Sequence, residues 1–234
     1  MTGPGADATA RILEELGLVA VLRGADASRV AEAARSLGEG GVTAVEITYT
    51  VPGATGVIER LAAEGDLFVG AGTITTRRQA DEAIAAGARF LVSPSLCEAA
   101  LSAGEEADVC VIPGVYTPTE LASAAARCPL LKLFPSAVGG PALLRALREP
   151  FPEVRLMPSG GVSLDNLAEW IDAGAVAVSA GGGLCPKDAV AAGDWPRVTE
   201  LAGRWRAALG EARARCRPAT QSPTGGARRP SKGA

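Results

Sequence analysis

Short runs of apolar and β-branched residues alternate along the chain with alanine-rich stretches whose apolar residues recur at helical spacing. The alanine-rich stretches, for example residues 28–41 and 75–88, carry glycine near their ends, where helices commonly stop. The pattern predicts eight strands, each followed by a helix. The strands are expected at residues 19–23, 43–48, 67–72, 89–93, 108–113, 130–134, 154–158 and 176–181.

Alternating strands and helices favour a parallel sheet joined by right-handed crossovers. Eight units of about 20 to 25 residues match the smaller end of the (β/α)8 TIM barrel, so we predict this α/β fold. A doubly wound open sheet is the alternative architecture. An additional helix near residues 8–16 precedes the first strand and is placed to cover the floor of the barrel.

We expect three segments, with an N-terminal helix in residues 1–17, the barrel in 18–210 and a basic, disordered tail in 211–234. Residues 217–234 contain no leucine, isoleucine, valine or aromatic residue, so they have little to add to a core. The tail holds six basic side chains and one acidic side chain, which leaves residues 1–210 with 17 basic and 25 acidic side chains. An acidic body with no evident basic face argues against a nucleic-acid partner.

The chain has no histidine, which excludes Ser-His-Asp and Cys-His nucleophile systems, histidine-ligated metals and histidine proton shuttles. Its five cysteines are scattered without a CxxC motif, so neither a disulfide framework nor a zinc site is predicted. We expect no metal and no other cofactor. No apolar run approaches the roughly 20 residues of a spanning helix and no signal-peptide pattern begins the chain, so we expect a cytoplasmic protein without a membrane partner.

Lys132 stands out because every neighbour from Leu130 to Phe134 is apolar. A strand here puts its amine either inside the barrel or between the sheet and the helices, and lysine is rarely buried without a partner. One interpretation is an edge position or a lysine held by a carboxylate. The other is an amine nucleophile, since desolvation favours the neutral amine that attacks a carbonyl carbon.

Glu46 is a second charge in an apolar strand, between Val45 and Ile47. Because side chains alternate along a strand, Glu46 projects from the face opposite to these two residues. Glu46 lies on the second predicted strand and Lys132 on the sixth, so in a closed barrel they would project from opposite walls toward one centre. We predict that the two side chains form a catalytic pair.

Two glycine-rich segments, residues 157–170 and 178–186, follow the seventh and eighth predicted strands. Glycine runs between a strand and a helix expose backbone N–H groups to an anion, and barrels commonly bind phosphate at these two loops. A tight turn alone explains either run, but both together favour a phosphate site, to which Ser159 adds a hydroxyl. After the third strand, Thr73 is either a polar contact for the ligand or the N-cap of the next helix.

The tryptophans and tyrosines differ in the places predicted for them. Trp170, Trp195 and Trp205 lie in or beside predicted outer helices and are expected to pack there. Tyr49 and Tyr116 lie near the ends of the second and fifth strands, so both remain candidates for the mouth of the barrel.

Several segments, in order over about residues 18–186, carry a family resemblance: AVLRG, GVTAVEITYTVPGA, GAGTITT, FLVSPSL, VIPGVYTPTEL, LKLFPSAVGGPALLRAL and LMPSGGVSLDNLAEWIDAGAVAV. They closely resemble the 2-keto-3-deoxy-6-phosphogluconate / 4-hydroxy-2-oxoglutarate aldolases, and LKLFP and PSGGV are specific to that family. The resemblance implies a homotrimeric (β/α)8 class I aldolase that forms a Schiff base with pyruvate, a small keto acid, and needs no metal.

The resemblance also implies roles for individual residues. Lys132 matches the Schiff-base lysine, and Glu46 matches the general acid-base that works through a water molecule. The residues implied to line the pyruvate pocket or to bind phosphate are Thr73, Pro94 and Phe134 for the pocket, and Ser159, Gly160 and Gly161 for phosphate.

Two departures from the family pattern concern the choice of acceptor aldehyde. Many members carry an arginine after the catalytic glutamate, where it binds the substrate carboxylate, but the segment EITYTVPG has none. Arg23, at the end of the first strand, is a candidate substitute. The serine that some members carry in the loop after the eighth strand is also absent, which leaves the N–H groups of Gly181, Gly182 and Gly183 to bind phosphate.

Three alternative functions compete with this interpretation. The nearest is the same chemistry on the galactonate epimer, 2-keto-3-deoxy-6-phosphogalactonate. The second is a phosphosugar isomerase or epimerase on a similar barrel, which would use carboxylates without an imine and would not be trapped by borohydride. The third is a non-catalytic phosphometabolite sensor, and the intact pair of Lys132 and Glu46 argues against it.

Overall fold

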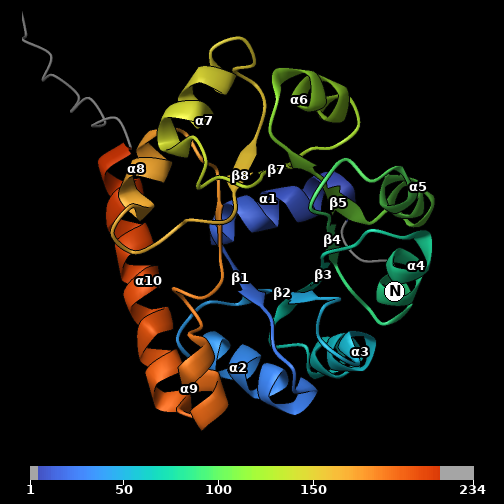
Figure 1. Ribbon diagram of the computed structural model, residues 1–234, viewed down its shortest axis with the longest axis vertical. Helices are drawn as coiled ribbons and strands as arrows, with labels where there is room; N and C mark the ends of the chain where they lie inside the picture. Colours follow the sequence, from blue (N-terminus) through green and yellow to red (C-terminus); the bar gives the residue numbers. More distant parts are fainter. Residues whose placement is uncertain (1–4, 217–234) are drawn as a thin grey trace, which may run out of the picture.

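The computed structural model describes residues 5–216 of the 234-residue chain (Figure 1). The strands are β1 (Leu18–Leu22), β2 (Ala44–Thr48), β3 (Phe68–Gly72), β4 (Phe90–Val92), β5 (Cys110–Ile112), β6 (Gly114–Val115), β7 (Leu131–Leu133), β8 (Leu156–Pro158) and β9 (Val178–Ala180). The helices are α1 (Ala6–Leu16), α2 (Ala27–Glu39), α3 (Ala54–Glu64), α4 (Arg77–Ala85), α5 (Glu98–Ala107), α6 (Pro118–Ala125), α7 (Gly140–Arg148), α8 (Leu167–Asp172), α9 (Lys187–Ala192) and α10 (Trp195–Cys216).

The strands form an α/β fold in which every ladder is parallel, as the alternation predicted. One sheet has the order β5-β4-β3-β2-β1-β9 and the other has the order β6-β7-β8. The predicted fifth strand is divided at Pro113, which has no N–H to donate to a ladder, so β5 ends one sheet and β6 begins the other. Between β8 and β9, Ser159 makes a bridge with Ser179.

Side chains of each strand enter two different core layers, because successive residues point to opposite faces. Val45 and Ile47 of β2 belong to the outer layer, between the strands and the surrounding helices. Ala44 belongs to an inner layer, together with Leu130 just before β7. Helices α2 to α10 surround the strands, while α1 lies across their centre (Figure 1).

Helix α1 covers the end of the fold at which the strands begin. Its residues Ala10 and Leu13 are buried in the same inner layer as Ala44 and Leu130. This apolar floor leaves the other end of the strands, where their carboxyl termini lie, as the open face.

Three helices begin at residues whose side chains accept backbone hydrogen bonds. Asp26 accepts from two N–H groups at the start of α2. Thr76 and Thr117 form reciprocal capping boxes with Gln79 and Glu120 at the starts of α4 and α6. Within the described residues, none of the helices is both long and apolar enough to cross a bilayer.

Helix α10 continues through Cys216, so the boundary predicted at residue 210 is wrong for residues 211–216. Ala212 is buried, and the Arg213 guanidinium donates hydrogen bonds to the carbonyls of Glu14, Glu15 and Val176. These bonds satisfy carbonyls at the end of α1 and fix the last turn of α10. The rest of the predicted tail, residues 217–234, lies outside the described residues.

We expect Arg213→Ala to lower the free energy of unfolding by about 2 to 3 kcal/mol, because charge-assisted hydrogen bonds are lost and α1 carbonyls are left without a donor. The matched control is Arg215→Ala, which removes an exposed arginine from the same turn and is expected to cost less than about 0.5 kcal/mol. Urea unfolding followed by circular dichroism measures both. Equal effects of the two changes would contradict the role assigned to Arg213.

Candidate active site

Lys132 lies at the centre of β7, in register with Gly114 of β6 and Met157 of β8. Leu130, two residues earlier, belongs to the inner layer, so by alternation Lys132 also points into the interior rather than toward the helices. Its exposed fraction is 3%, and its Nζ lies 5.0 Å from the ring centroid of Phe134. The amine therefore lies in an apolar setting with an aromatic face nearby, where a cation is stabilised.

Glu46 occupies the centre of β2, in register with Val21 of β1 and Gly70 of β3. It shares the inward face of the strand with Ala44 and is completely buried. Neither Oε1 nor Oε2 has a hydrogen-bond partner among the described residues. Lys132 is thus not bound to this carboxylate, which contradicts the interpretation that the lysine is simply held by an acid.

Gly72 makes room for the Glu46 side chain. A Cβ atom at Gly72 would overlap the Glu46 carboxylate, which lies directly against the last residue of β3. Gly70, two residues earlier, meets the ring of Phe90 in the same way. At Gly70 and Gly72 the inward face of β3 is therefore bare backbone, and the space is filled by the side chains of Phe90 and Glu46 from the neighbouring strands.

The two buried ionisable groups define the chemistry available in the interior. A buried charge without a partner costs several kcal/mol, so native proteins rarely keep one that has no role. Lys132 and Glu46 come from different sheets, and each lies two residues beyond an inner-layer residue, toward the carboxyl ends of the strands. An amine and a carboxylate above a closed apolar floor are the groups needed for imine formation and proton transfer.

The three predicted pocket residues lie at the carboxyl ends of three strands. Thr73 follows β3 directly and has a left-handed backbone, with φ of 59°. The N-cap of the next helix is Thr76, so the capping role considered for Thr73 is wrong. Pro94 follows β4, and Phe134 follows β7 with its ring near Lys132; all three side chains are partly buried.

The glycine loops lie beside each other after β8 and β9. Gly160 and Gly161 have φ of 81° and 92°, values that favour glycine, and both are exposed. The bridge between Ser159 and Ser179 joins the start of the first loop to β9, and the hydroxyls of these buried serines are 3.4 Å apart. Gly182 and Gly183 are also exposed, while Gly181 is partly buried.

Arg23 is exposed just after β1, at the carboxyl end of the strand. It lines a cleft of about 510 Å³ together with Arg29 and Lys187. Lys187 is the first residue of α9. Arg23 therefore lies at the rim of the open face, whereas Lys132 and Glu46 are inside.

Burial makes the nearby thiols poor competitors of Lys132. Desolvation raises the pKa of Cys110, which faces the inner layer, to about 12. It raises the pKa of Cys185, which follows the second glycine loop, to about 11. Both thiols are therefore protonated at neutral pH, and the thiol is not the nucleophilic form of cysteine.

Sequence reasoning missed Ser136, which is completely buried in the loop after β7. Its hydroxyl donates to the carbonyl of Gly160 at 2.6 Å. Of the two candidate tyrosines, Tyr116 donates to the carbonyl of Val138 in the same loop at 2.9 Å. The hydroxyl of Tyr49 pairs with Thr55, and burial raises its pKa.

The predicted tryptophan packing is found in the outer layer. Trp170 and Trp205 are almost completely buried there, and Trp195 is partly buried against it.

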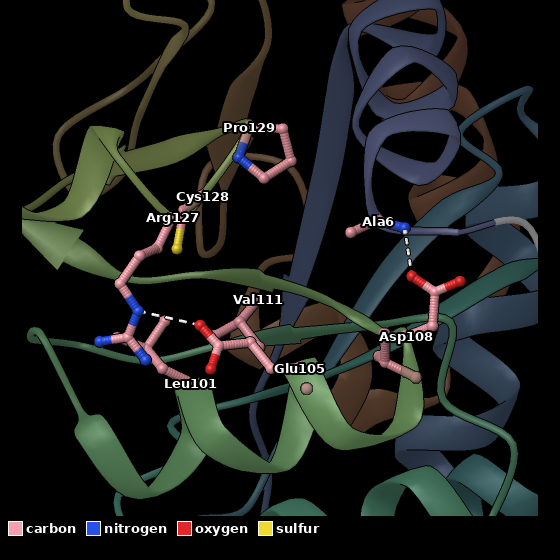
Figure 2. Close-up of a pocket in the computed structure, with 10 residues that line it drawn as sticks. Ala6, Leu101, Glu105, Asp108, Val111, Arg127, Cys128 and Pro129 are labelled. Carbon is pink, nitrogen blue, oxygen red and sulfur yellow. Dashed lines mark hydrogen bonds and ion pairs between the residues drawn. The ribbon is translucent and has the colours of Figure 1, made fainter.

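A separate cavity of about 270 Å³ lies beside α5, with Ala6 of α1 at its edge (Figure 2). Arg127 and Glu105 form an ion pair at 2.9 Å in its wall, and Asp108 accepts a hydrogen bond from the N–H of Ala6. None of the predicted site residues lines this cavity. It lies near the end covered by α1, away from the open face.

The model of the KDPG and KHG aldolase family matches residues 9–201. The 2-dehydro-3-deoxy-phosphogluconate aldolase of Pseudoalteromonas atlantica is 37% identical over 79% of this chain and 87% of its own length. A probable 2-dehydro-3-deoxy-6-phosphogalactonate aldolase of Rhizobium meliloti is 36% identical over 77% of this chain and 86% of its own length. The crystal structure of the Legionella pneumophila KDPG aldolase, with pyruvate captured as a covalent carbinolamine, matches with a TM-score of 0.78 and 30% identity. The match covers 83% of this chain and 96% of the Legionella chain.

A parallel α/β fold with a buried amine and a buried carboxylate at the open ends of its strands is thus accompanied by a family match over most of the chain. The chain belongs to the KDPG and KHG aldolase family, whose members are lyases.

We expect Gly72→Ala to lower aldolase kcat by about 10²-fold, the low end of what a general base contributes, because the new methyl group displaces the Glu46 carboxylate. The overlap reaches Cγ of this buried side chain as well as its carboxylate, so a stability cost of about 1 to 3 kcal/mol is expected in addition. Gly70→Ala is the contrasting variant: its methyl group meets the buried Phe90 ring and should cost about 1 to 3 kcal/mol of stability. Steady-state kinetics and thermal melts separate the two, and a normal kcat for Gly72→Ala would contradict the placement of Glu46.

Proposed function

We propose that this protein is a class I aldolase that cleaves 2-keto-3-deoxy-6-phosphogluconate to pyruvate and glyceraldehyde 3-phosphate. The same site would cleave 4-hydroxy-2-oxoglutarate to pyruvate and glyoxylate. The observation that carries the proposal is that Lys132 and Glu46 both point into the apolar interior without being bound to each other. The family match supports the assignment.

The first half of the reaction builds an electron sink. The neutral amine of Lys132 attacks C2 of the keto acid, and the C2 oxygen leaves as water to give an iminium. The ring of Phe134, 5.0 Å from Nζ, stabilises the positive charge that the iminium carries. No metal or other cofactor is needed in this proposal, since the iminium itself accepts the electrons.

The second half depends on Glu46. Its carboxylate accepts the proton of the C4 hydroxyl through a bridging water, and the electrons of the C3–C4 bond move onto the iminium to give an enamine. C4 leaves as the aldehyde carbon. Glu46 then returns the proton to C3, and water hydrolyses the new iminium to pyruvate and free Lys132.

The remaining proposed contacts bind the two ends of the substrate. Thr73, Pro94 and Phe134 would line the pyruvate pocket, and Arg23 at the rim would bind the carboxylate that many family members bind with a different arginine. The proposed phosphate site consists of Ser159, Gly160, Gly161, Gly181, Gly182 and Gly183. The similarity to the Rhizobium meliloti protein favours the galactonate epimer as a second candidate substrate, and product analysis with both epimers distinguishes them.

We also propose that the two sheets together form one closed (β/α)8 barrel over residues 18–210, extended by the end of α10. Supporting closure, β5 runs directly into β6 through Pro113, and the N–H of Val176 donates to the carbonyl of Leu156 at 3.1 Å beside the bridge between Ser159 and Ser179. A homotrimer in the cytoplasm completes the proposal and rests on the family resemblance. Sedimentation equilibrium tests the trimer.

We expect Lys132→Arg to abolish cleavage although the charge is kept, because an imine needs a primary amine. Borohydride with pyruvate should add mass to the wild-type protein at Lys132 and none to the variant, as measured by peptide mass mapping. An adduct at Lys187 in the variant would identify a different nucleophile. Activity without any labelled lysine would favour the carboxylate-only isomerase or epimerase.

Glu46→Gln should behave differently, since it removes the proton acceptor and leaves the amine. We expect turnover to fall by about 10²- to 10⁴-fold, the usual contribution of a general base. Trapping of pyruvate by borohydride should persist. Loss of trapping in a folded Glu46→Gln protein would mean that Glu46 is required for imine formation itself.

A further inference from the structure

Three side chains that are not among the proposed substrate contacts donate hydrogen bonds to backbone carbonyls of the two glycine loops. The hydroxyl of Ser136 donates to the carbonyl of Gly160 at 2.6 Å, and the Asn166 amide donates to the carbonyl of Gly161 at 2.8 Å. In the second loop, the indole N–H of Trp205 donates to the carbonyl of Gly183 at 3.3 Å.

These bonds determine where the N–H groups of the first loop point. In a trans peptide, the carbonyl of one residue and the N–H of the next point in opposite directions. Since the carbonyls of Gly160 and Gly161 point toward Ser136 and Asn166, the N–H groups of Gly161 and Val162 point away from them. Within the described residues, neither N–H has an acceptor.

In the second loop, backbone hydrogen bonds instead of side chains determine where an N–H group points. The carbonyl of Gly181 accepts hydrogen bonds from Leu184 and Cys185 at 2.9 and 2.8 Å, so the N–H of Gly182 points away from that turn. The N–H of Gly182 likewise has no acceptor among the described residues. Trp205, which is completely buried in α10, holds the far side of this turn.

The donors behind the first loop are themselves fixed. Ser136 is completely buried, and its own N–H donates to the carbonyl of Ser159 at 2.9 Å. The Asn166 side chain is held at its other end, because its Oδ1 accepts from the N–H of Ser163 at 2.8 Å. Each donor is therefore oriented before any ligand arrives, which lowers the cost of binding one.

We propose that Ser136, Asn166 and Trp205 are positioning residues for the phosphate group of the substrate. Ser136 and Asn166 fix the carbonyls of Gly160 and Gly161 and so leave the N–H groups of Gly161 and Val162 free to bind phosphate oxygens. Trp205 anchors the second loop at Gly183, in the turn that leaves the N–H of Gly182 free. Ser136 comes from the loop that follows β7, the strand of Lys132, so phosphate binding is tied to the element that carries the proposed nucleophile. This inference rests on the proposed function.

The test compares two substrates that differ only in the phosphate, 2-keto-3-deoxy-6-phosphogluconate and 2-keto-3-deoxygluconate. We expect Ser136→Ala and Asn166→Ala each to raise KM for the phosphorylated substrate about 10-fold, as the loss of one oriented hydrogen-bonding group implies. The kcat for this substrate should be retained, because a remote group contributes binding that is equal in ground and transition states. The kcat/KM for the unphosphorylated substrate should not change.

Matched controls are available for the serine and the tryptophan. Ser36→Ala is the control for the serine. The buried Ser36 hydroxyl donates to the carbonyl of Glu32 at 3.0 Å within α2, far along the chain from both glycine loops. Trp205→Phe should raise KM for the phosphorylated substrate. Trp170→Phe should not, because the buried indole N–H of Trp170 has no partner within the described residues. Thermal melts of all variants identify any that are simply unstable.

The outcomes separate the two proposals. A wild-type protein with equal kcat/KM for both substrates would overturn the phosphate site itself. A wild-type preference for the phosphorylated substrate that survives in Ser136→Ala, Asn166→Ala and Trp205→Phe would overturn the positioning role alone. Equal losses with both substrates in folded variants would mean that these side chains support the fold rather than the orientation of the loops.

Discussion

The cost of holding an amine and a carboxylate in an apolar interior is the constraint to which the rest of the structure responds. A buried ionised group is destabilising by several kcal/mol unless a partner compensates it, and the Glu46 carboxyl has no hydrogen-bond partner among the described residues. The free energy that offsets this cost comes from apolar burial in the outer layer, where the strands pack against the helices. The inner layer is apolar below the two groups and is covered by α1, so the polar end of the interior lies toward the carboxyl ends of the strands.

Periodicity in the sequence located the strands closely, and each observed strand start lies within about two residues of the predicted one, apart from the short β6. It also placed Glu46 on the inward face, because Val45 and Ile47 define the outer one. It left Lys132 undecided, because all of its neighbours are apolar and either face of β7 would accept them. The structure decides this through Leu130, which packs in the inner layer.

What the sequence did not reveal depends on contacts between residues far apart in the chain. Arg213 belongs to a segment poor in large apolar residues, and its hydrogen bonds to the end of α1 cross almost the whole sequence. Ser136 has no local signature either, since its partner, Gly160, is 24 residues away. The sequence pattern also cannot distinguish the structural roles of glycine. Gly72 leaves room for a carboxylate, whereas Gly161 adopts a left-handed backbone conformation in a turn.

The link between α1 and α10 has a consequence for the order in which the molecule is completed. The carbonyls that end α1 receive hydrogen bonds from Arg206 and Arg213, so the first helix cannot reach its final capped state until residue 213 has been synthesised. During translation, these carbonyls are therefore expected to stay without their arginine donors until α10 emerges from the ribosome. Pairing of chain regions this distant slows folding, so the capping of α1 by these arginines is expected to follow the formation of the local βα contacts.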